Sequence, residues 1–428
     1  MPNTLEGTRF HAYGPRHIDT IARRYGLPPD VRESMRRVSL VLPFRVNDYV
    51  LDHLVDWTSV PDDPMFQLTF PQPGMLSDED DRRLATVTGS ALREAVDDIR
   101  SRLNPHPSAQ WSNVPVQGGA AVPGLQHKYR ETVLYFPRQG QTCHAYCTYC
   151  FRWAQFIGDP GLRFAAADPS GLITYLRAHP EVHDVLVTGG DPMVMSAERL
   201  RDHLVPLLSV PTVRTIRIGT KSVAYWPQRF TTDDDADEVA RLFEDVVASG
   251  RQLAVMAHFS HPRELGTDLA RRALRRISAT GAEIYCQAPL IAHVNDDPAV
   301  VSELWRAESS MGAVPYYLFV ARDTGPHEYF KVPLARAVDV FRTAYRTVPG
   351  LARTVRGPVM SAASGKVVVD GAEGGYFQLR MVQARDPGLV GRPFRAHHSA
   401  TAAWLDELDL APDTPPDLAA ACRPTSVS

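Results

Sequence analysis

Three cysteines stand within eight residues of one another, at Cys143, Cys147 and Cys150. Their spacing, C-x3-C-x2-C, puts three thiols on one short loop, and thiolates are the soft ligands that zinc and iron–sulfur clusters prefer. Three protein ligands leave one corner of the metal site open, which a structural zinc site does not do. The spacing therefore favours a [4Fe-4S] cluster with one iron open to a small molecule, over three cysteines that only pack in a core.

The composition limits the classes of protein to which the chain can belong. It has 428 residues, 44% of them hydrophobic, and a formal net charge of -3, which is typical of a globular chain. Basic residues are scattered among acidic ones, so we expect no nucleic-acid partner. No apolar stretch is long enough to span a membrane, and the N-terminus does not resemble a signal peptide. Five cysteines, mostly clustered, do not form a secreted disulfide framework, so we expect a reducing, cytoplasmic location.

Short apolar runs alternate with helical patterns through the middle of the chain. This alternation repeats about six times and predicts an α/β fold, a partial (β/α)6 barrel with parallel strands. We expect an N-terminal helical region over 1–122, the barrel over 123–348 and a C-terminal extension over 349–428. In the first region, residues 78–103 have the period of one helix; in the last, "GKVVVD" and "YFQLRMV" predict strands. The cysteine loop follows the first barrel strand, "ETVLYFP", where such folds carry their chemistry.

The cysteine spacing is identified as the radical S-adenosylmethionine signature, and the chain resembles the lysine 2,3-aminomutase family over roughly residues 40 to 385. The resemblance implies a [4Fe-4S] cluster on the three cysteines, S-adenosylmethionine on its open iron, and a 5′-deoxyadenosyl radical that removes hydrogen from a free amino acid. It also implies a reducing partner such as flavodoxin or ferredoxin, and it leaves a homo-oligomer open. The matching stretches include "LPFRVNDYVL", "VPGLQHKYRETVLYF", "CHAYCTYCFRW", "VTGGDP", "RIGTKSVAYWPQRF", "AHFSHPREL", "PLIAHVND", "PYYLF" and "VRGPVMSAASGKVVVD".

The same resemblance assigns cofactor contacts beyond the cysteine loop. Gly189, Gly190 and Asp191 of "TGGDP" end the second barrel strand, where glycine lets the backbone approach S-adenosylmethionine. His258 in "AHF" and Gln287 in "CQAP" match positions that contact the adenosine or methionyl part of that molecule. The alternative for these two is a polar residue satisfied inside the barrel.

Substrate contacts are implied in the same way. Arg152 matches the arginine that binds the substrate carboxylate, and a guanidinium pairs with a carboxylate through two parallel hydrogen bonds. Asp370 matches one of two aspartates that hold the distal ammonium of lysine. Arg322 stands where the second aspartate is expected, and it would repel an ammonium. Lysine itself is therefore doubtful as the substrate.

The chain departs from the family where pyridoxal phosphate would bind. Tyr376 and Phe377 occupy the place of the lysine that carries this cofactor, and a Schiff base needs an amine. Thr132 stands where the family has an arginine for the phosphate, although Arg130 is close by. These changes predict an enzyme without pyridoxal phosphate. Outside the loop the cysteines are Cys286 and Cys422, too few for the family zinc site, so we expect no structural zinc.

Lys366 is the one lysine that could replace the missing amine. The chain has four lysines, and Lys366 lies four residues before Asp370 in a strand pattern, so both side chains are expected on one face and in one cavity. We therefore take both as catalytic candidates. Lys366 could be a relocated Schiff-base lysine, a partner for a substrate carboxylate or a proton carrier; the other lysines are poorer candidates.

Three functions follow from these patterns. The leading hypothesis is a radical S-adenosylmethionine enzyme that acts on an amino acid or close derivative without pyridoxal phosphate, most directly by oxidation to an alkene, with epimerisation or elimination open. The alternative is an aminomutase that keeps pyridoxal phosphate through Lys366. The third is a cluster-bearing scaffold or sensor, against which the retained "GGDP", His258 and Gln287 argue, since a sensor needs none of them.

Overall fold

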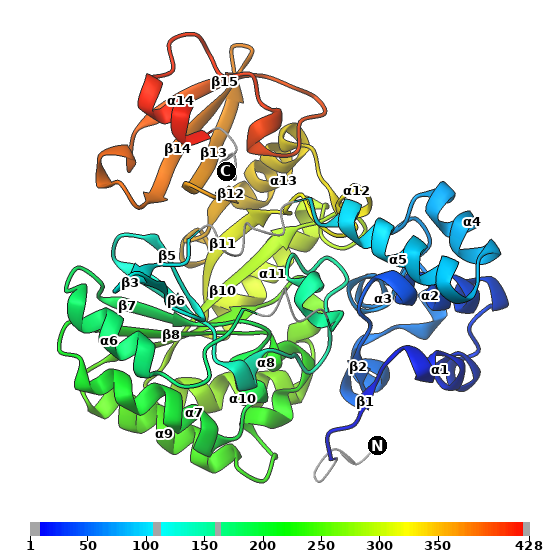
Figure 1. Cartoon of the computed structure of the whole chain (residues 1–428), viewed down its shortest axis with the longest axis horizontal. Helices are drawn as coiled ribbons and strands as arrows, with labels where there is room; N and C mark the ends of the chain where they lie inside the picture. Colours follow the sequence, from blue (N-terminus) through cyan, green and yellow to red (C-terminus); the bar gives the residue numbers. More distant parts are fainter. Residues whose placement is uncertain (1–8, 106–112, 159–163, 423–428) are drawn as a thin grey trace.

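The computed structural model of the protein describes residues 9–105, 113–158 and 164–422. Its main feature is a sheet of eleven described strands in the spatial order β15-β14-β13-β12-β11-β10-β9-β8-β7-β6-β5. Figure 1 shows three parts around this sheet: a helical N-terminal region, a barrel and a C-terminal extension. None of the helices in the described ranges is both long enough and apolar enough to cross a membrane.

Six parallel strands follow one another in sequence order and confirm the predicted partial barrel. Each is separated from the next by a helix, and Figure 1 shows these helices on the outer face. The strands are β6 (Thr132–Tyr135), β7 (Asp184–Val187), β8 (Thr215–Thr220), β9 (Gln252–His258), β10 (Glu283–Leu290) and β11 (Val314–Val320). The helices are α6 (Ser170–Ala178), α7 (Ala197–Leu204), α9 (Ala236–Ala248), α10 (Asp268–Ala279), α11 (Pro298–Ser310) and α13 (Leu334–Thr347).

The residue pattern of each strand decides which face meets the helices. In β8, Ile216 and Ile218 are fully buried, whereas Arg217 between them and Gly219 after them are only partly buried. The alternation follows from the two-residue period of a strand. The apolar residues thus pack under the helices, and polar ones such as Arg217 are left for the interior of the barrel.

The N-terminal region is helical, as the sequence predicts. Its helices are α1 (Ile18–Tyr25), α2 (Pro29–Val41), α3 (Pro64–Thr69), α4 (Asp78–Thr86) and α5 (Gly89–Leu103). The prediction of one helix over 78–103 is wrong, because the helix is interrupted between α4 and α5. Val87 and Thr88 are extended there and Gly89 has a φ of 60°, a left-handed conformation that only glycine adopts without strain.

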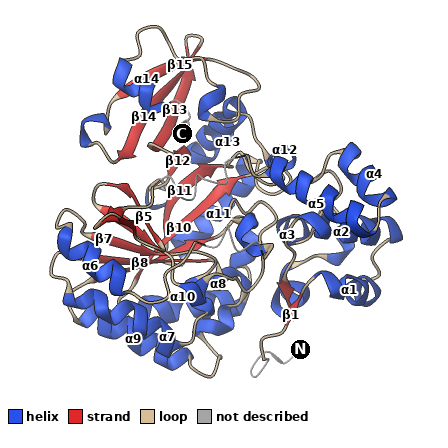
Figure 2. Ribbon diagram, in the orientation of Figure 1, coloured by secondary structure: helices blue, strands red, loops and turns tan. Residues whose placement is uncertain are grey.

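The C-terminal extension continues the barrel sheet. β12 (Arg356–Ala362) pairs in parallel with β11, and β13 (Gly365–Glu373), β14 (Tyr376–Ala384) and β15 (Pro393–His397) then add antiparallel strands. The two strands predicted from "GKVVVD" and "YFQLRMV" are confirmed as β13 and β14. Figure 2 shows these strands rising from the barrel toward α14 (Pro416–Cys422). The sheet therefore runs unbroken across the predicted boundary at residue 349.

At its other edge the sheet ends with β5 (Leu125–Tyr129), which is antiparallel to β6. β14 lies against β5, so the two ends of the curved sheet approach each other. One end of the barrel interior is thus bounded by β5, by the loops after β6 and β11, and by β12.

Candidate active site

The cysteine loop follows β6 and is held in place by the N-terminal region. Tyr146 N–H donates to Arg45 O at 2.8 Å, and Thr148 N–H donates to Leu68 O at 3.0 Å. The Asn47 side chain also donates to the backbone oxygen of His144, at 3.2 Å. These bonds join segments about a hundred residues apart in the chain. The N-terminal helices therefore form one wall of the site, a role that the sequence did not reveal.

All three loop cysteines are free thiols and partly exposed. Burial of the sulfur atoms raises the pKa of Cys143 and Cys147, and that of Cys150 to about 12, so the thiols are neutral until a metal replaces their protons. No three His, Cys, Asp or Glu side chains of the described residues converge on a single metal position. A cubane does not require this, because each thiolate binds a different iron. The soft donor set on one loop fits a [4Fe-4S] cluster.

The end of β7 packs directly against the cysteine loop and requires glycine. A Cβ atom on Gly190 would lie 2.4 Å from the backbone oxygen of Thr142, and one on Gly189 would lie 2.1 Å from the side-chain nitrogen of Gln141. Gly189 also has a φ of 141°. Two glycines thus let the strand end and the cysteine loop touch, and their predicted contact with S-adenosylmethionine stays a prediction.

The carboxylate of Asp191 lies at the centre of a hydrogen-bond network at the ends of two barrel strands. Its buried carboxylate accepts hydrogen bonds from Met193 N, Thr220 Oγ1, Lys221 N and Ser222 Oγ, at 2.7 to 2.9 Å. Its own N–H donates to the oxygens of the cysteine loop at Gly140 and Thr142. Asp191 therefore fixes the ends of β7 and β8 to that loop, and its predicted contact with S-adenosylmethionine stays a prediction.

His258, the last residue of β9, pairs with Gln287 within β10, and their predicted contacts with S-adenosylmethionine stay a prediction. His258 Nε2 is 3.2 Å from the hydroxyl of Tyr149 on the cysteine loop. Burial, with the positive charge of Lys221 beside it, lowers the pKa of His258 well below its usual range, so the imidazole is neutral. The structure thus brings the cysteine loop and these two residues into one site.

A buried ion pair beneath the cysteine loop was not foreseen. Lys221 Nζ lies 2.6 Å from Glu264 Oε1, with 9% of the lysine side chain and none of the glutamate exposed. Lys221 also donates to His258 O at 3.2 Å, and Glu264 accepts from the backbone N–H groups of Ser260 and His261. The stretch "SHPREL" could have indicated the place of Glu264. A glutamate three residues after the residue that begins a short helical turn is typical of a capping box.

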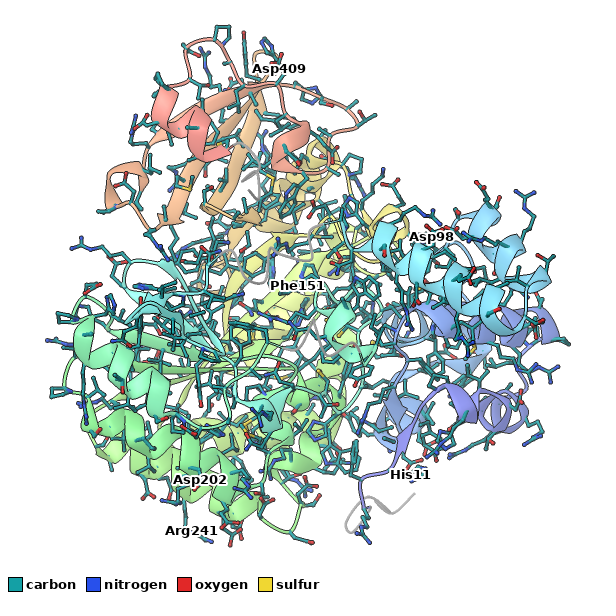
Figure 3. All side chains as sticks on the ribbon, in the orientation of Figure 1. His11, Asp98, Phe151, Asp202, Arg241 and Asp409 are labelled. Carbon is teal, nitrogen blue, oxygen red and sulfur yellow. The ribbon has the colours of Figure 1, made fainter. Side chains whose placement is uncertain are left out.

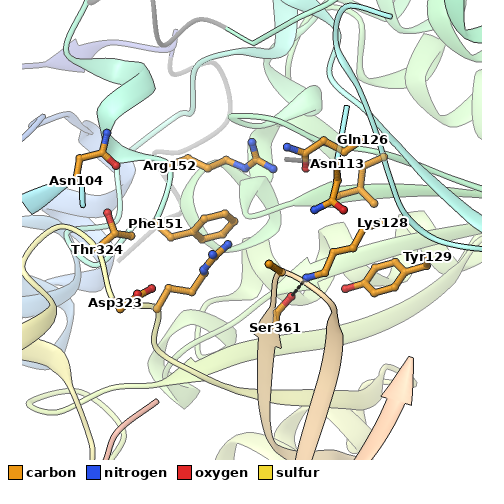
Figure 4. Close-up of a pocket in the computed structure, with 13 residues that line it drawn as sticks. Asn104, Asn113, Gln126, Lys128, Tyr129, Phe151, Arg152, Asp323, Thr324 and Ser361 are labelled. Atoms are coloured by element: carbon orange, nitrogen blue, oxygen red, sulfur yellow. Dashed lines mark hydrogen bonds between the residues drawn. The ribbon is translucent and has the colours of Figure 1, made fainter. Parts of the chain in front are cut away.

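A pocket of about 130 Å³ lies beside the cysteine loop. Figure 3 places Phe151 in the middle of the molecule, where the three parts of the fold meet. In Figure 4, Arg152 and Lys128 extend toward the pocket from different sides. The structure therefore brings the predicted substrate residues Arg152 and Arg322 together, and it adds Lys128. The lining residues are Asn104, Asn113, Gln126, Lys128, Tyr129, Leu134, Phe151, Arg152, Arg322, Asp323, Thr324, Ser361 and Ala363.

Arg152 is held rigidly in this pocket. Only 8% of the residue is exposed, and its guanidinium carbon lies 4.3 Å from the centre of the Phe136 ring and 5.2 Å from that of Phe151. Burial lowers its pKa to about 10, so the side chain remains a cation at neutral pH. A fixed, partly dehydrated guanidinium is suited to bind a carboxylate.

Asp370 does not line this pocket. It also shares no cavity with Lys366, so that prediction is wrong. Both Asp370 oxygens accept from Arg380 at 2.9 Å, and 41% of the aspartate side chain is exposed. The physical reason is an irregularity in β13: the pairing with β14 skips from Val369 to Gly371, which leaves Asp370 as an extra residue where the strand leaves the barrel. The structure gives Asp370 neither a catalytic nor a substrate-binding position.

Lys366 is enclosed by aromatic rings. Its Nζ lies 4.5 Å from the ring centre of Tyr317, 5.0 Å from that of Tyr129 and 5.9 Å from that of Phe319. It donates to Gln383 Oε1 at 2.9 Å, and burial lowers its pKa to about 7. Lys366 does not line the pocket that contains Arg152.

Searches among known proteins gave close sequence relatives and remote structural ones. No protein-family model matches the chain. A protein of Aquifex aeolicus named "Putative L-lysine 2,3-aminomutase" is 30% identical over 381 residues, which cover 89% of this chain and 91% of that protein. The L-lysine 2,3-aminomutase of Acetoanaerobium sticklandii is 25% identical over 323 residues, covering 76% of this chain and 68% of that protein. A solved radical SAM methyltransferase from Sphaerobacter thermophilus is 16% identical with a TM-score of 0.37, over 55% of this chain and 68% of that one.

Proposed function

The chain belongs to the lysine 2,3-aminomutase-like family of radical S-adenosylmethionine enzymes, and we propose that it removes hydrogen from a free amino acid or close derivative without pyridoxal phosphate. The family implies a [4Fe-4S] cluster and S-adenosylmethionine as cofactors. Cys143, Cys147 and Cys150 would hold the cluster. When bound, the cluster supplies the electron that cleaves S-adenosylmethionine and yields a 5′-deoxyadenosyl radical.

One observation carries the proposal: the place of the pyridoxal phosphate lysine is filled by apolar packing. Phe377 is fully buried in the core of the C-terminal extension, together with Leu379 and Met381. Thr132, which replaces the phosphate-binding arginine, is buried and donates to Asp184 at 3.0 Å. A phenyl ring cannot form a Schiff base, and a hydroxyl already bound to a carboxylate is a poor anchor for phosphate.

The absence of an imine limits the fate of the substrate. An amino group that is not part of an imine cannot migrate by the aminomutase route, so loss of a second electron and a proton is the most direct outcome. In the net reaction, S-adenosylmethionine becomes methionine and 5′-deoxyadenosine, and the substrate becomes an alkene. One substrate hydrogen enters 5′-deoxyadenosine. The other leaves as a proton and an electron, and this electron balances the one that cleavage consumes.

The residues of this chain would orient the substrate and exclude water. Arg152 would hold the carboxylate, and its stacking on Phe136 fixes the direction of approach. The contact between the Tyr149 hydroxyl and His258 Nε2 joins the cysteine loop to the end of β9 and would close that side of the site. We also propose a reducing partner such as flavodoxin or ferredoxin and a cytoplasmic location.

Arg152→Ala should weaken substrate-dependent 5′-deoxyadenosine formation by roughly 30-fold or more, because removing one partner of a desolvated charge pair costs about 2–5 kcal/mol. Arg152→Lys should restore only part of this, since an ammonium is a point charge and not a planar fork. The measurement is the dependence of product formation on substrate concentration. Iron content should not change, and Arg336→Ala, which removes an exposed arginine, is the matched control. An Arg152→Ala enzyme with wild-type substrate affinity would refute this role.

A second candidate function is favoured by the state of Lys366. A pKa of about 7 leaves much of its amine neutral, which is what attachment of pyridoxal phosphate requires. An aminomutase that uses Lys366 would then be possible. Its enclosure by Tyr129 and Tyr317, away from the Arg152 pocket, speaks against this candidate.

The two functions separate in one experiment on the purified protein. We expect turnover without added pyridoxal phosphate, no absorbance band of lysine-bound pyridoxal, and a product two hydrogens lighter than the substrate. Borohydride reduction after incubation with pyridoxal phosphate, followed by peptide mass spectrometry, reads out attachment directly. A pyridoxyl group on Lys366, lost in Lys366→Met, would overturn the proposed function and support the aminomutase.

A further inference from the structure

We propose that the substrate is an amino acid with a second anionic group, and that Lys128 and Arg322 bind this group while Arg152 binds the first. The proposal rests on the proposed function in one respect: it takes the pocket beside the cysteine loop as the place of the substrate. It adds the chemical class of that substrate, because it requires two separate negative charges.

The first argument is that three cations line one pocket in which Asp323 is the single acidic residue among the lining residues. Lys128, Arg152 and Arg322 all line it. No carboxylate of the described residues lies within 4.0 Å of the side-chain nitrogens of these three residues. Arginines elsewhere in the molecule form ion pairs even where their side chains are exposed to water. Buried cations are normally paired, since removing an unpaired charge from water is costly. The missing negative charge is then supplied by a ligand.

The second argument is the state of each donor. Arg322 Nε is buried without a hydrogen-bond partner among the described residues, and its guanidinium carbon lies 5.5 Å from the ring centre of Phe151. Lys128 Nζ donates only to the neutral hydroxyl of Ser361, at 3.3 Å (Figure 4). Both groups therefore keep donors for an anion, although the negative charge of Asp323 acts on Arg322 from within the same pocket.

The third argument is mutual repulsion. Burial lowers the pKa of Lys128, and the positive charges of Arg322 and Lys366 lower it further. Repulsion between like charges inside a pocket destabilises the protein when no ligand is bound. Such arrangements are typical of binding sites. An anion that reaches these cations would relieve the repulsion.

The size of the pocket limits the ligand to a small molecule. Each water-sized group needs roughly 10–15 Å³ by this measure, so about 130 Å³ accepts on the order of ten non-hydrogen atoms. A dicarboxylic amino acid has this size, and so does an amino acid with a short phosphate ester. Both present one carboxylate for Arg152 and a second anion for Lys128 and Arg322.

The test is equilibrium binding to the cluster-loaded protein, measured anaerobically by calorimetry with S-adenosylmethionine present. L-Glutamate and L-aspartate are compared with L-glutamine and L-asparagine, which have nearly the same shapes without the second charge, and O-phospho-L-serine is compared with L-serine, which lacks the phosphate. We expect at least one anionic member to bind about tenfold or more tightly than its neutral counterpart. Preference for the carboxylates or for the phosphate ester identifies the second anion.

Variants connect this preference to the two cations. Lys128→Met and Arg322→Met should each reduce the preference about tenfold, and their melting temperatures should equal or exceed that of the wild type, because an unpaired charge has been removed. Lys331→Met, at an exposed lysine, is the matched control and should change neither quantity. A purely structural lysine would give the opposite result, a lower melting temperature with unchanged binding.

The outcomes distinguish this inference from the proposed function. Equal or tighter binding of the neutral or cationic amino acids, or binding of pyridoxal phosphate in this pocket, would overturn the inference. Formation of 5′-deoxyadenosine with a neutral amino acid would support the proposed function and contradict the inference of an anionic substrate. Selective binding of an anionic amino acid, with no cleavage of S-adenosylmethionine under reduction, would support the inference and contradict the proposed function.

Discussion

Cys147→Ala should abolish the formation of 5′-deoxyadenosine. Anaerobically reconstituted wild-type protein is expected to hold about four irons per chain, as in a cubane ligated by cysteines. Cys147 lies between the other two ligands, and nothing at this position of the loop can replace its sulfur. Iron content and sulfide content should fall together, and the product, measured by chromatography after reduction with S-adenosylmethionine, should disappear.

The matched control for this loss is Cys422→Ala. Cys422 is a buried free thiol in α14, far along the chain from the loop. Its removal should leave iron content and product formation close to the wild-type values. Full activity of Cys147→Ala, or an equal loss in Cys422→Ala, would contradict the assignment of the cluster to the loop.

Glu264→Ala should lower the free energy of unfolding by about 3–5 kcal/mol, because it leaves the charge of Lys221 buried without a partner. The same change removes the acceptor for the backbone N–H groups of Ser260 and His261. The measurement is chemical denaturation of the cluster-free protein, which separates folding from iron loading. An effect of this size is a large part of the stability of a folded domain.

Two further variants test the cause of that loss. Lys221→Met combined with Glu264→Leu removes both charges, and it should recover the part of the stability that was lost to the unpaired ion, while the N–H groups of Ser260 and His261 still lack their acceptor. Glu328→Ala breaks the exposed pair with Lys331 and should cost less than about 1 kcal/mol. If Glu264→Ala cost no more than Glu328→Ala, the pair beneath the loop would not contribute as its burial indicates.

The sequence predicted the features that depend on local patterns. Alternating apolar runs and helical periods gave the partial barrel, and the strand before Cys143 placed the cysteine loop at the correct end of it. Such inferences succeed because period and spacing act within a few residues. Arg152 was assigned from the resemblance to the family; the structure places it in the pocket beside the cysteine loop, and its contact with substrate stays a prediction.

Other features depended on contacts between distant segments. Lys128 and Ser361 meet only because β5 and β12 bound the same opening of the sheet, and no local pattern connects them. Asp370 was misplaced because one extra residue in β13 changes the pairing without changing the alternation of residue types. The break before Gly89 was missed because the apolar period continues through it while the backbone does not.

The backbone bonds from Arg45 and Leu68 to the cysteine loop have a consequence for how variants of this protein are interpreted. These bonds hold Tyr146 and Thr148, the residues on either side of Cys147, and so set the spacing of the three sulfur atoms. Iron loading is thus a property of the whole chain and not of the loop alone. Genetic changes within the first seventy residues, far from any cysteine, would present as a metal deficiency.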